Sequence, residues 1–500
     1  MARLAPFRQQ DFLSGMAGNV NESIRANNSV AFIQNMDVDE ELGSLVSRLG
    51  TGIVESQLQD GKVCLGLHNF RDSVGSGHKL FAVFNVANDA TATIHDVAST
   101  DDRTSQTAST KTRFVTFLDS MLAINGADAE LAWNGSSWIS TGGAFDLANI
   151  PSSNKVKYAI EWQDRVYVAG DTAAATSDRI YYSSTPSAGV VSFTTGNGQQ
   201  DIEPEDGGGT ITGFGKVPGY LLIFKERSVK RWNFLSAFPE TLMNIGTPSQ
   251  ESVINAGGLC AFFSASSRES KGFYVTNGGR PVPISHDVAN GIKKWVDAIP
   301  QAYEDDVAGW GNERYLMWSI GDVTVDGTDY TNVVLKYHLK LKAWTMRTYP
   351  SEFRFFSGFV SSGNNVLVGG DDDGTILEID KVSTYTDYNS GTAAAVPIHW
   401  KVRSHDEDFK YYNLKTISER VIVNSRKAHD ARLEIGIDGE WDGDKAMNVG
   451  KVWKDYSELK LKRAITGHRF SWALAGSQNG GRAYIKGVEF PHVEVLPNYS

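Results

Sequence analysis

The sequence has few of the features that mark an exported, disulfide-bonded or membrane-spanning protein. Only two of its 500 residues are cysteines, Cys64 and Cys260, and each lies in an apolar run of strand type. One disulfide is an alternative, but two buried free thiols are expected, as in a protein assembled in a reducing cytosol. No run of about 18 apolar residues occurs, and the first residues lack the apolar core of a signal peptide. We therefore expect neither membrane insertion nor export.

The usual motifs of catalysis are also missing. The sequence contains no G-x-S-x-G, H-E-x-x-H, C-x-x-C or P-loop motif, and no S-x-D-x-G-x-x-W box of sugar-cleaving propellers. Carboxylates are plentiful, but a pair that flanks a glycosidic bond is not recognisable in one sequence. We predict that the chain is not an enzyme and uses no cofactor or metal, with a hydrolase or lyase as the alternative.

Positive charge is in short supply as well. Lys and Arg number 48 against 59 Asp and Glu, which gives a net charge of −11. A protein whose main task is to grip phosphates needs clustered cations, so this balance argues against that class. It does not exclude a protein past which nucleic acid slides.

What the sequence does have is a repeated hairpin between residues 79 and 380. An apolar strand begins at Lys79, Ser120, Arg165, Tyr220, Gly272, Arg314 and Asn365, and a second strand follows each about ten residues later. A period of about 40 to 50 residues with up to four strands is typical of β-propeller blades, which bury their faces by stacking in a ring. A β-helix and two consecutive sandwiches are the alternatives.

The predicted fold class is all-β: a six- or seven-bladed β-propeller with an N-terminal arm and a C-terminal β-sandwich. Residues 1–55 have the composition of loops and are expected to supply closing strands to the propeller, which spans residues 56–390. Residues 391–500 lose the period and show strands of alternating pattern, as in a sandwich. One helix is predicted, from Ser285 to Ile299, with Ser285 or Asp287 as its N-cap.

Several stretches carry a resemblance to a known family. They are Phe12-Leu-Ser-Gly-Met, Asn35-Met36, Gly43-Ser-Leu-Val-Ser-Arg-Leu-Gly-Thr51, 211–213, 221–229, 342–345 and 373–380. The chain resembles the tail hub and nozzle proteins of short-tailed bacteriophages, whose opening reads F-x-G-G, an asparagine and then G-x-L-x-x-R-x-G. Phe12-Leu-Ser-Gly departs from the first of these motifs, whereas residues 43–50 match the last.

The resemblance implies a structural virion protein. Such propellers form a ring, usually a hexamer, below the portal and its adaptor, and the ring retains packaged DNA and conducts it during ejection. The implied partners are further copies of the chain, the portal or adaptor, other tail proteins, and double-stranded DNA that passes without sequence-specific binding. The implied location is the virion tail, after assembly in the host cytoplasm. A tail-associated carbohydrate- or receptor-binding propeller module is the alternative.

Two sets of residues are candidates for function. Acidic loops that would line a DNA channel contain Asp201, Glu203, Glu205, Asp206, Asp371, Asp372 and Asp373. An acidic wall would repel the DNA phosphates and keep the duplex moving, although solvated turn tips and, for Asp371 and Asp373, a calcium site are alternatives. Candidate subunit contacts lie on the apolar face of the predicted helix, at Val288, Ile292 and Trp295, with packing of this face on a blade as the alternative.

Overall fold

The chain folds almost entirely into β-strands, which confirms the all-β prediction. The computed structural model describes residues 3–9, 11–18, 28–39, 43–54, 58–72, 78–97, 102–139, 145–146, 155–171, 176–187, 190–193, 197–203, 207–233, 236, 238–286, 291–361, 363–408, 412–417, 420–425, 430–437, 440–448, 457–460, 469–478 and 481–497. No helix in these residues is long and apolar enough to cross a membrane.

Seven antiparallel meanders of four strands follow one another in the described chain and are named the first to seventh sheets. The first four are β6 (Cys64–Arg71), β7 (His78–Asn85), β8 (Ala92–Asp96), β9 (Arg103–Gln106); β10 (Arg113–Phe117), β11 (Ser120–Ile124), β12 (Leu131–Trp133), β13 (Trp138–Ile139); β15 (Tyr158–Trp162), β16 (Arg165–Ala169), β17 (Arg179–Tyr182), β19 (Gly198–Asp201); and β20 (Ile211–Val217), β21 (Tyr220–Lys225), β22 (Val229–Trp232), β23 (Glu240–Met243). The last three are β24 (Ile254–Ala256), β25 (Leu259–Ser264), β26 (Gly272–Thr276), β27 (Val282–Pro283); β28 (Ala308–Gly311), β29 (Tyr315–Val325), β30 (Thr328–His338), β31 (Ala343–Thr348); and β32 (Phe353–Ser361), β33 (Asn364–Asp371), β34 (Ile376–Ile379), β5 (Gly52–Ile53). A short parallel pair, β14 (Phe145–Asp146) and β18 (Val191–Ser192), lies outside them.

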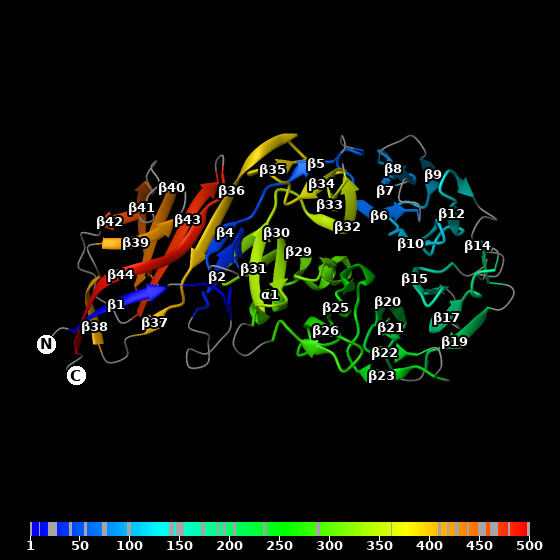
Figure 1. Ribbon diagram of the computed structural model, residues 1–500, viewed down its shortest axis with the longest axis horizontal. Coiled ribbons are helices and arrows are strands. Elements are labelled where there is room, and N and C mark those ends of the chain that lie inside the picture. The colour runs from blue at the N-terminus through cyan, green and yellow to red at the C-terminus, as the bar shows by residue number, and fades with distance from the viewer. Residues whose placement is uncertain are drawn as a thin grey trace.

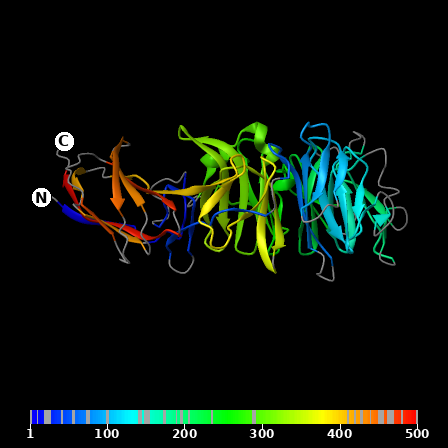
Figure 2. The ribbon, with the colours of Figure 1, turned by 90° about the horizontal axis from the view of Figure 1, so that it is seen from above.

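The seven sheets form a closed ring. The first strand of each sheet contacts the first strand or its partner in the next, and β32 of the seventh sheet contacts β6 of the first. Figure 1 shows the sheets around this ring, and Figure 2 shows the same ring from above, with the C-terminal strands beside it. Each neighbouring pair of sheets shares its own hydrophobic core, so a sheet is apolar on both faces.

This two-sided burial explains why the sequence revealed the hairpins. Strands in the middle of a sheet, such as β11, are buried along their whole length and read as continuous apolar runs. Each of the seven predicted hairpins lies in a different sheet. Outer strands such as β9 and β19 are largely exposed and polar, and the sequence therefore did not reveal them.

The N-terminal segment completes the ring. Strand β5 pairs with β34 through Gly52 opposite Glu378 and Ile53 opposite Leu377. The fourth strand of the seventh sheet therefore comes from the chain that precedes the first sheet. Because β5 leads directly toward β6, this pairing joins the two ends of the ring.

The rest of the N-terminal segment pairs with strands from the C-terminal part of the chain. The long strand β44 (Tyr484–Pro497) pairs with β1 (Arg3–Gln9) and with the hairpin of β3 (Met36–Val38) and β4 (Leu45–Ser47). It also pairs with β38 (Tyr412–Ile417) and β39 (Arg420–Ser425), and β39 pairs in turn with β42 (Ser457–Lys460). Strand β2 (Phe32–Gln34) lies between β31 and β36 (Ala394–Arg403). From β36 the sheet continues through β43 (Arg469–Gln478), β40 (Asp430–Ile437) and β41 (Glu440–Asn448). Strand β35 (Thr386–Asn389) also pairs with β36, and β37 (Glu407–Asp408) pairs with β43. The sixth sheet is thus continuous with a C-terminal sheet through β2.

A fully buried arginine holds this junction together. The Arg48 guanidinium donates to the Asp387 carboxylate at 2.8 Å and to the Thr348 carbonyl at 2.7 Å. Its Nε donates to the Asn35 side-chain oxygen at 3.0 Å, and the Thr348 amide donates to the same oxygen at 2.9 Å. Arg48 also lies over the Tyr349 ring, 4.2 Å from its centroid. One side chain therefore links the arm, the sixth sheet and β35.

A second buried arginine, Arg347, lies on β31 next to Thr348. Arg347 donates to Asp37 at 2.6 Å and to Asp380 at 2.9 Å. Burial alone would raise the pKa of Asp37, but Arg347 and Lys336 outweigh it and hold this pKa below its ordinary range. Asp37 belongs to the arm and Asp380 follows β34, so Arg347 ties the arm to both the sixth and the seventh sheets.

The predicted helix is shorter than expected, and of its two predicted roles the structure shows packing on the sheets of the same chain. Helix α1 spans Lys293–Asp297, and the Ser285 hydroxyl accepts a hydrogen bond from the Phe273 amide of β26 instead of capping a helix. Ile292 and Trp295 are buried in the chain's own core, where Trp295 stacks on Phe32 of the arm, so they do not form subunit contacts. Val288 and Asp287 lie outside the described residues.

The junction predicts a large effect for one substitution. Arg48→Met should lower the free energy of unfolding by about 3–5 kcal/mol, because Asp387 stays buried without its cation. Adding Asp387→Leu should recover much of this loss, since the double variant buries no unpaired charge. Urea unfolding measures both. As a control, Lys62→Met removes a partly exposed pair with Asp89 and should cost less than about 1 kcal/mol; equal losses at the two sites would contradict the account.

Candidate functional site: a cavity at the open end of the ring

The first strands of the sheets line the axis of the ring, and their two ends differ. Residues that directly precede or begin these strands meet at one end, here called the closed end. Residues from the later part of the same strands line two cavities at the other end of the ring, here called the open end.

Ion pairs cross the axis at the closed end. Lys111, just before β10 of the second sheet, lies 2.8 Å from Asp306, which directly precedes β28 of the sixth. Arg113 of β10 contacts Glu251, before β24 of the fifth sheet, at 2.7 Å. Arg354 of the seventh sheet reaches Asp306 at 2.6 Å. The second sheet neighbours neither the fifth nor the sixth, so the pairs of Lys111 and Arg113 bridge the ring, whereas Arg354 and Asp306 join two neighbouring sheets.

Two glutamates at this end have opposite pKa shifts. Burial opposes ionisation of Glu251, but Arg113 and Lys111 outweigh it and lower its pKa to about 2. Burial raises the pKa of Glu352 to about 7. Arg354 lies 2.9 Å from Glu352, but the two atoms do not meet in hydrogen-bond geometry, so this cation compensates only weakly for burial.

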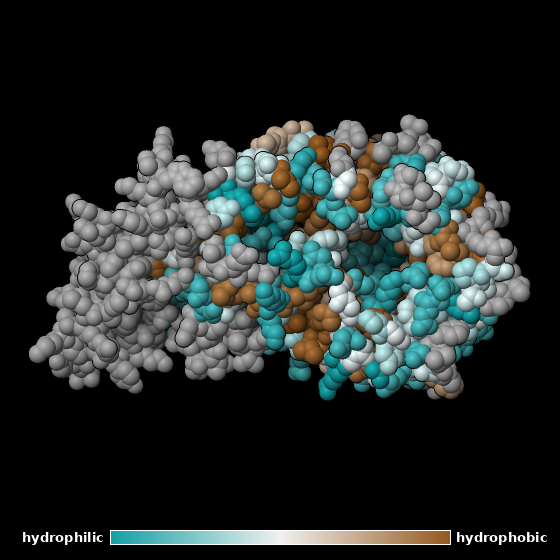
Figure 3. All heavy atoms as spheres, viewed as in Figure 1, coloured by the Kyte–Doolittle hydropathy of each residue, from teal (hydrophilic) through white to brown (hydrophobic). Residues whose placement is uncertain are grey.

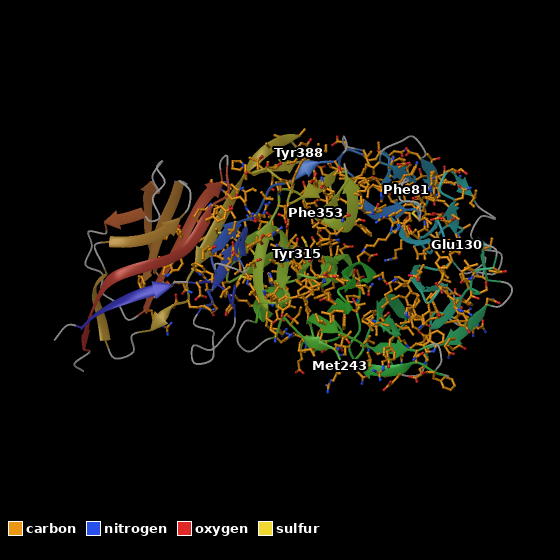
Figure 4. The ribbon with its side chains drawn as sticks, viewed as in Figure 1. Phe81, Glu130, Met243, Tyr315, Phe353 and Tyr388 are labelled. Atoms are coloured by element: carbon orange, nitrogen blue, oxygen red, sulfur yellow. The ribbon has the colours of Figure 1, made fainter. Side chains whose placement is uncertain are left out.

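Two cavities occupy the open end and share Asn69 and Arg71 of β6. The larger has a volume of about 1040 Å³ and lies between the sixth and seventh sheets; the smaller, of about 320 Å³, extends toward the second to fourth sheets. Figure 3 shows a hollow within the ring with mostly hydrophilic residues around it. Figure 4 labels Phe81, Glu130, Met243, Tyr315 and Phe353 at different places round the ring.

The larger cavity combines aromatic rings with amides. Trp310 and Tyr315 are half-buried, their ring centroids are 6.1 Å apart, and both side chains belong to its lining, as does Phe359. The amides come from Asn69, Asn312, Asn364 and Asn365. This wall offers both flat apolar surface and groups that donate and accept hydrogen bonds.

The ionisable groups near the cavities are largely neutral or paired. Glu161 lies 2.7 Å from Lys216, and Asp380 is held by Arg347. Burial lowers the pKa of His68 to about 4, so His68 is neutral at physiological pH, and its Nε2 lies 2.7 Å from the Thr116 hydroxyl. The cavities therefore present little unbalanced charge.

The first predicted acidic loop lies at the rim of the ring, away from these cavities. Asp201 ends β19, the outer strand of the third sheet, and its carboxylate pairs with Arg179 at 2.5 Å. Glu203 pairs with the buried Lys230 at 2.6 Å. Glu205 and Asp206 lie outside the described residues.

The second predicted acidic group shapes a turn. Asp371 is fully buried; its carboxylate accepts hydrogen bonds from the amides of Thr375 and Asp373, at 2.8 and 3.1 Å, and from the Ser390 hydroxyl. Burial raises the pKa of Asp371 to about 6. The prediction that Asp371 lines a channel is wrong, because its side chain is inside the protein.

The neighbours of Asp371 have related roles. The Asp372 carboxylate accepts a bond from the Glu352 amide at 2.9 Å, and Asp373 is half-buried in the same turn. The structure does not bring this group together with Asp201 and Glu203, which lie on another sheet. Within the described residues, no group of three or more His, Cys, Asp or Glu side chains is arranged to hold a metal ion.

Sequence reasoning missed both ends of the ring. The cross-axis ion pairs come from residues next to the first strand of each sheet. These first strands are too short or too mixed in polarity to be recognised in the sequence. Their only signal is a charged residue just before a strand, as at Lys111, Glu251 and Asp306. Which of these charges meet depends on ring closure. Both cysteines are buried free thiols, as predicted.

Comparison with known proteins identifies no family for the chain. No protein-family model and no curated protein matches it. Among solved structures, it is similar to an exo-β-1,3-galactanase from Phanerochaete chrysosporium with galactose (10% identity, TM-score 0.27, covering 78% of this chain and 97% of that one). It is also similar to YCF48 bound to D1 peptide (11%, 0.37, 67% and 95%) and to the extracellular domain of a one-component system from B. thetaiotaomicron (10%, 0.41, 88% and 62%). At these TM-scores the similarities assign no activity.

The two glutamates predict opposite pH effects. The folded pKa of Glu352 lies above its ordinary value of 4.5, so its ionisation destabilises the protein as the pH rises from about 4.5 through 7. Glu352→Gln should therefore raise stability at pH 8 by up to about 3 kcal/mol and change it little at pH 4. Urea unfolding at both pH values measures this.

Glu251→Gln is the matched comparison. The folded pKa of Glu251 lies below its ordinary value of 4.5, so its contribution is present above that pH and is lost as the pH falls toward 2. This variant should be less stable than the natural chain at pH 7, by about 1–3 kcal/mol. Parallel pH profiles for the two variants would show that the closed end does not perturb these groups as described.

Proposed function

We propose that the chain is a structural subunit of a short-tailed bacteriophage tail. In this proposal it is a hub or nozzle protein that forms a ring of six like subunits below the portal and adaptor, retains packaged DNA and conducts it during ejection. The seven sheets are the blades of a seven-bladed β-propeller over residues 56–390, completed by β5 from the preceding segment. Residues 1–55 are its arm, and residues 391–500 form a β-sandwich with strands of that arm.

The observation that supports this proposal best is the position of the residues that carry the family resemblance. Phe12 is fully buried, Asn35 has a φ of 56° and bonds to both Arg48 and β31, and Gly43 has a φ of 63°. A positive φ favours Asn and Gly over other residues. The shared opening thus corresponds to the junction of arm, ring and C-terminal strands.

The closed end supports a bore between subunits. Lys111 and Arg113 make ion pairs across the axis, so the chain's own ring offers no open passage for a duplex. DNA would instead pass through a channel that several copies enclose. The net charge of −11 suits a surface that does not retain phosphates.

The state of the carboxylates at the cavities supports a role without catalysis. Glu161 is paired with Lys216 and Asp380 with Arg347, while Glu378 has Lys381 at 3.9 Å. A glycosidase needs one carboxyl group held protonated and another held as a free carboxylate on either side of the bond. These three carboxylates are each offset by a cation.

Immunogold electron microscopy tests the proposal. An antibody raised to the recombinant chain is applied to phage particles from the source lysate, with antibody preabsorbed on the same chain as the control. Gold should mark the portal vertex or tail shaft. Label confined to fibre tips, or an absence of label on all particles, would overturn the proposal.

A further inference from the structure

The larger open-end cavity has no part in the proposed assembly function. With a volume of about 1040 Å³, it lies at the upper end of the range for small-molecule sites, which is about 300–1,000 Å³. It is too large for a single water and too polar in its lining to stay dry. The cross-axis ion pairs lie at the opposite end of the ring, and none of their residues belongs to the cavity lining.

The lining suits a ligand that is neutral and carries both apolar faces and hydroxyl groups. Trp310 and Tyr315 supply flat surfaces on which C–H groups pack. Amides such as Asn365, which is exposed, both donate and accept hydrogen bonds, as hydroxyls require. A sugar ring has this combination of groups.

Charge in the cavity argues against an anionic ligand. The cationic side chains in its lining are Arg71 and Lys381, and the carboxylates of Glu378 and Asp380 lie in the same lining. A phosphate or a nucleic acid needs an excess of positive charge, which this balance does not supply.

Two further details favour an occupied recess. Gly358 on β32 faces open space, since a Cβ added there would meet no atom within 4 Å, although its φ is one that any residue adopts. Glycine weakens a strand interior, so its presence here costs stability and leaves room. The Asn69 side-chain oxygen has no hydrogen-bond partner in the described chain, and a ligand that draws this amide into the cavity would supply one.

We propose that this cavity binds a neutral oligosaccharide, with Trp310 and Tyr315 as the packing surface and Asn69 and Asn365 as hydrogen-bonding groups. The inference goes beyond the proposed tail function and does not depend on it. If the chain binds sugar but its antibody does not label the tail, this inference holds and the tail proposal fails. If the antibody labels the tail but the chain binds no sugar, the opposite is true.

The test uses the full chain and a variant that fills the recess. Fluorescently labelled protein is applied to an array of neutral and anionic oligosaccharides, and titration of the best neutral ligand then gives its affinity. Gly358→Tyr should weaken binding at least tenfold, because it places a large side chain on the cavity lining at a position with open space before it. Val282→Tyr is the control, since Val282 is 60% exposed on the outer strand β27 and lies outside the cavity lining.

Asn69→Leu keeps the test independent of folding. This change removes a polar atom that lacks a partner, so the melting temperature should be unchanged or higher while binding weakens. Binding only to anionic glycans, equal binding by Gly358→Tyr, or an absence of neutral ligands at millimolar concentration would each overturn the inference.

Discussion

The buried Arg48 is the constraint on which the rest of the structure depends. A guanidinium out of contact with water is tolerated only when its donors are satisfied and its charge is balanced. Asp387, the Thr348 carbonyl and Asn35 meet these needs, and they come from β35, the sixth sheet and the arm. The three segments must therefore be in place together. With Arg48 fixed, the chain reaches β5 four residues later, in position to pair with β34 and complete the seventh sheet.

Closure of the ring has consequences at both ends of its axis. It brings charged residues from the second, fifth, sixth and seventh sheets within ion-pair distance at one end. It also leaves Trp310, Tyr315 and their polar neighbours around an open recess at the other. One end bridged by ion pairs and an open end with a mixed polar and aromatic wall give the two faces of the ring different chemistry.

The seven hairpins show how far sequence patterns extend. Central strands such as β11 and β21 are buried on both faces, so their apolar runs are readable without knowledge of their neighbours. The short helix shows the limit of the same reasoning. The sequence shows its apolar face, but Ile292 and Trp295 are buried in the core of the same chain, where Trp295 stacks on Phe32 of the arm. An apolar face in the sequence does not reveal which segment packs against it.

The sequence by itself determined the all-β class, the period of the hairpins and the burial of Cys64 and Cys260, because these follow from local patterns of polarity. Only the tertiary structure decided which charges meet. Asp371 became a buried turn anchor and not an exposed acid, while Glu251 and Arg113, 138 residues apart, became partners across the ring. Pairings over such separations depend on how the sheets close around the axis, and the sequence next to either residue does not encode that geometry.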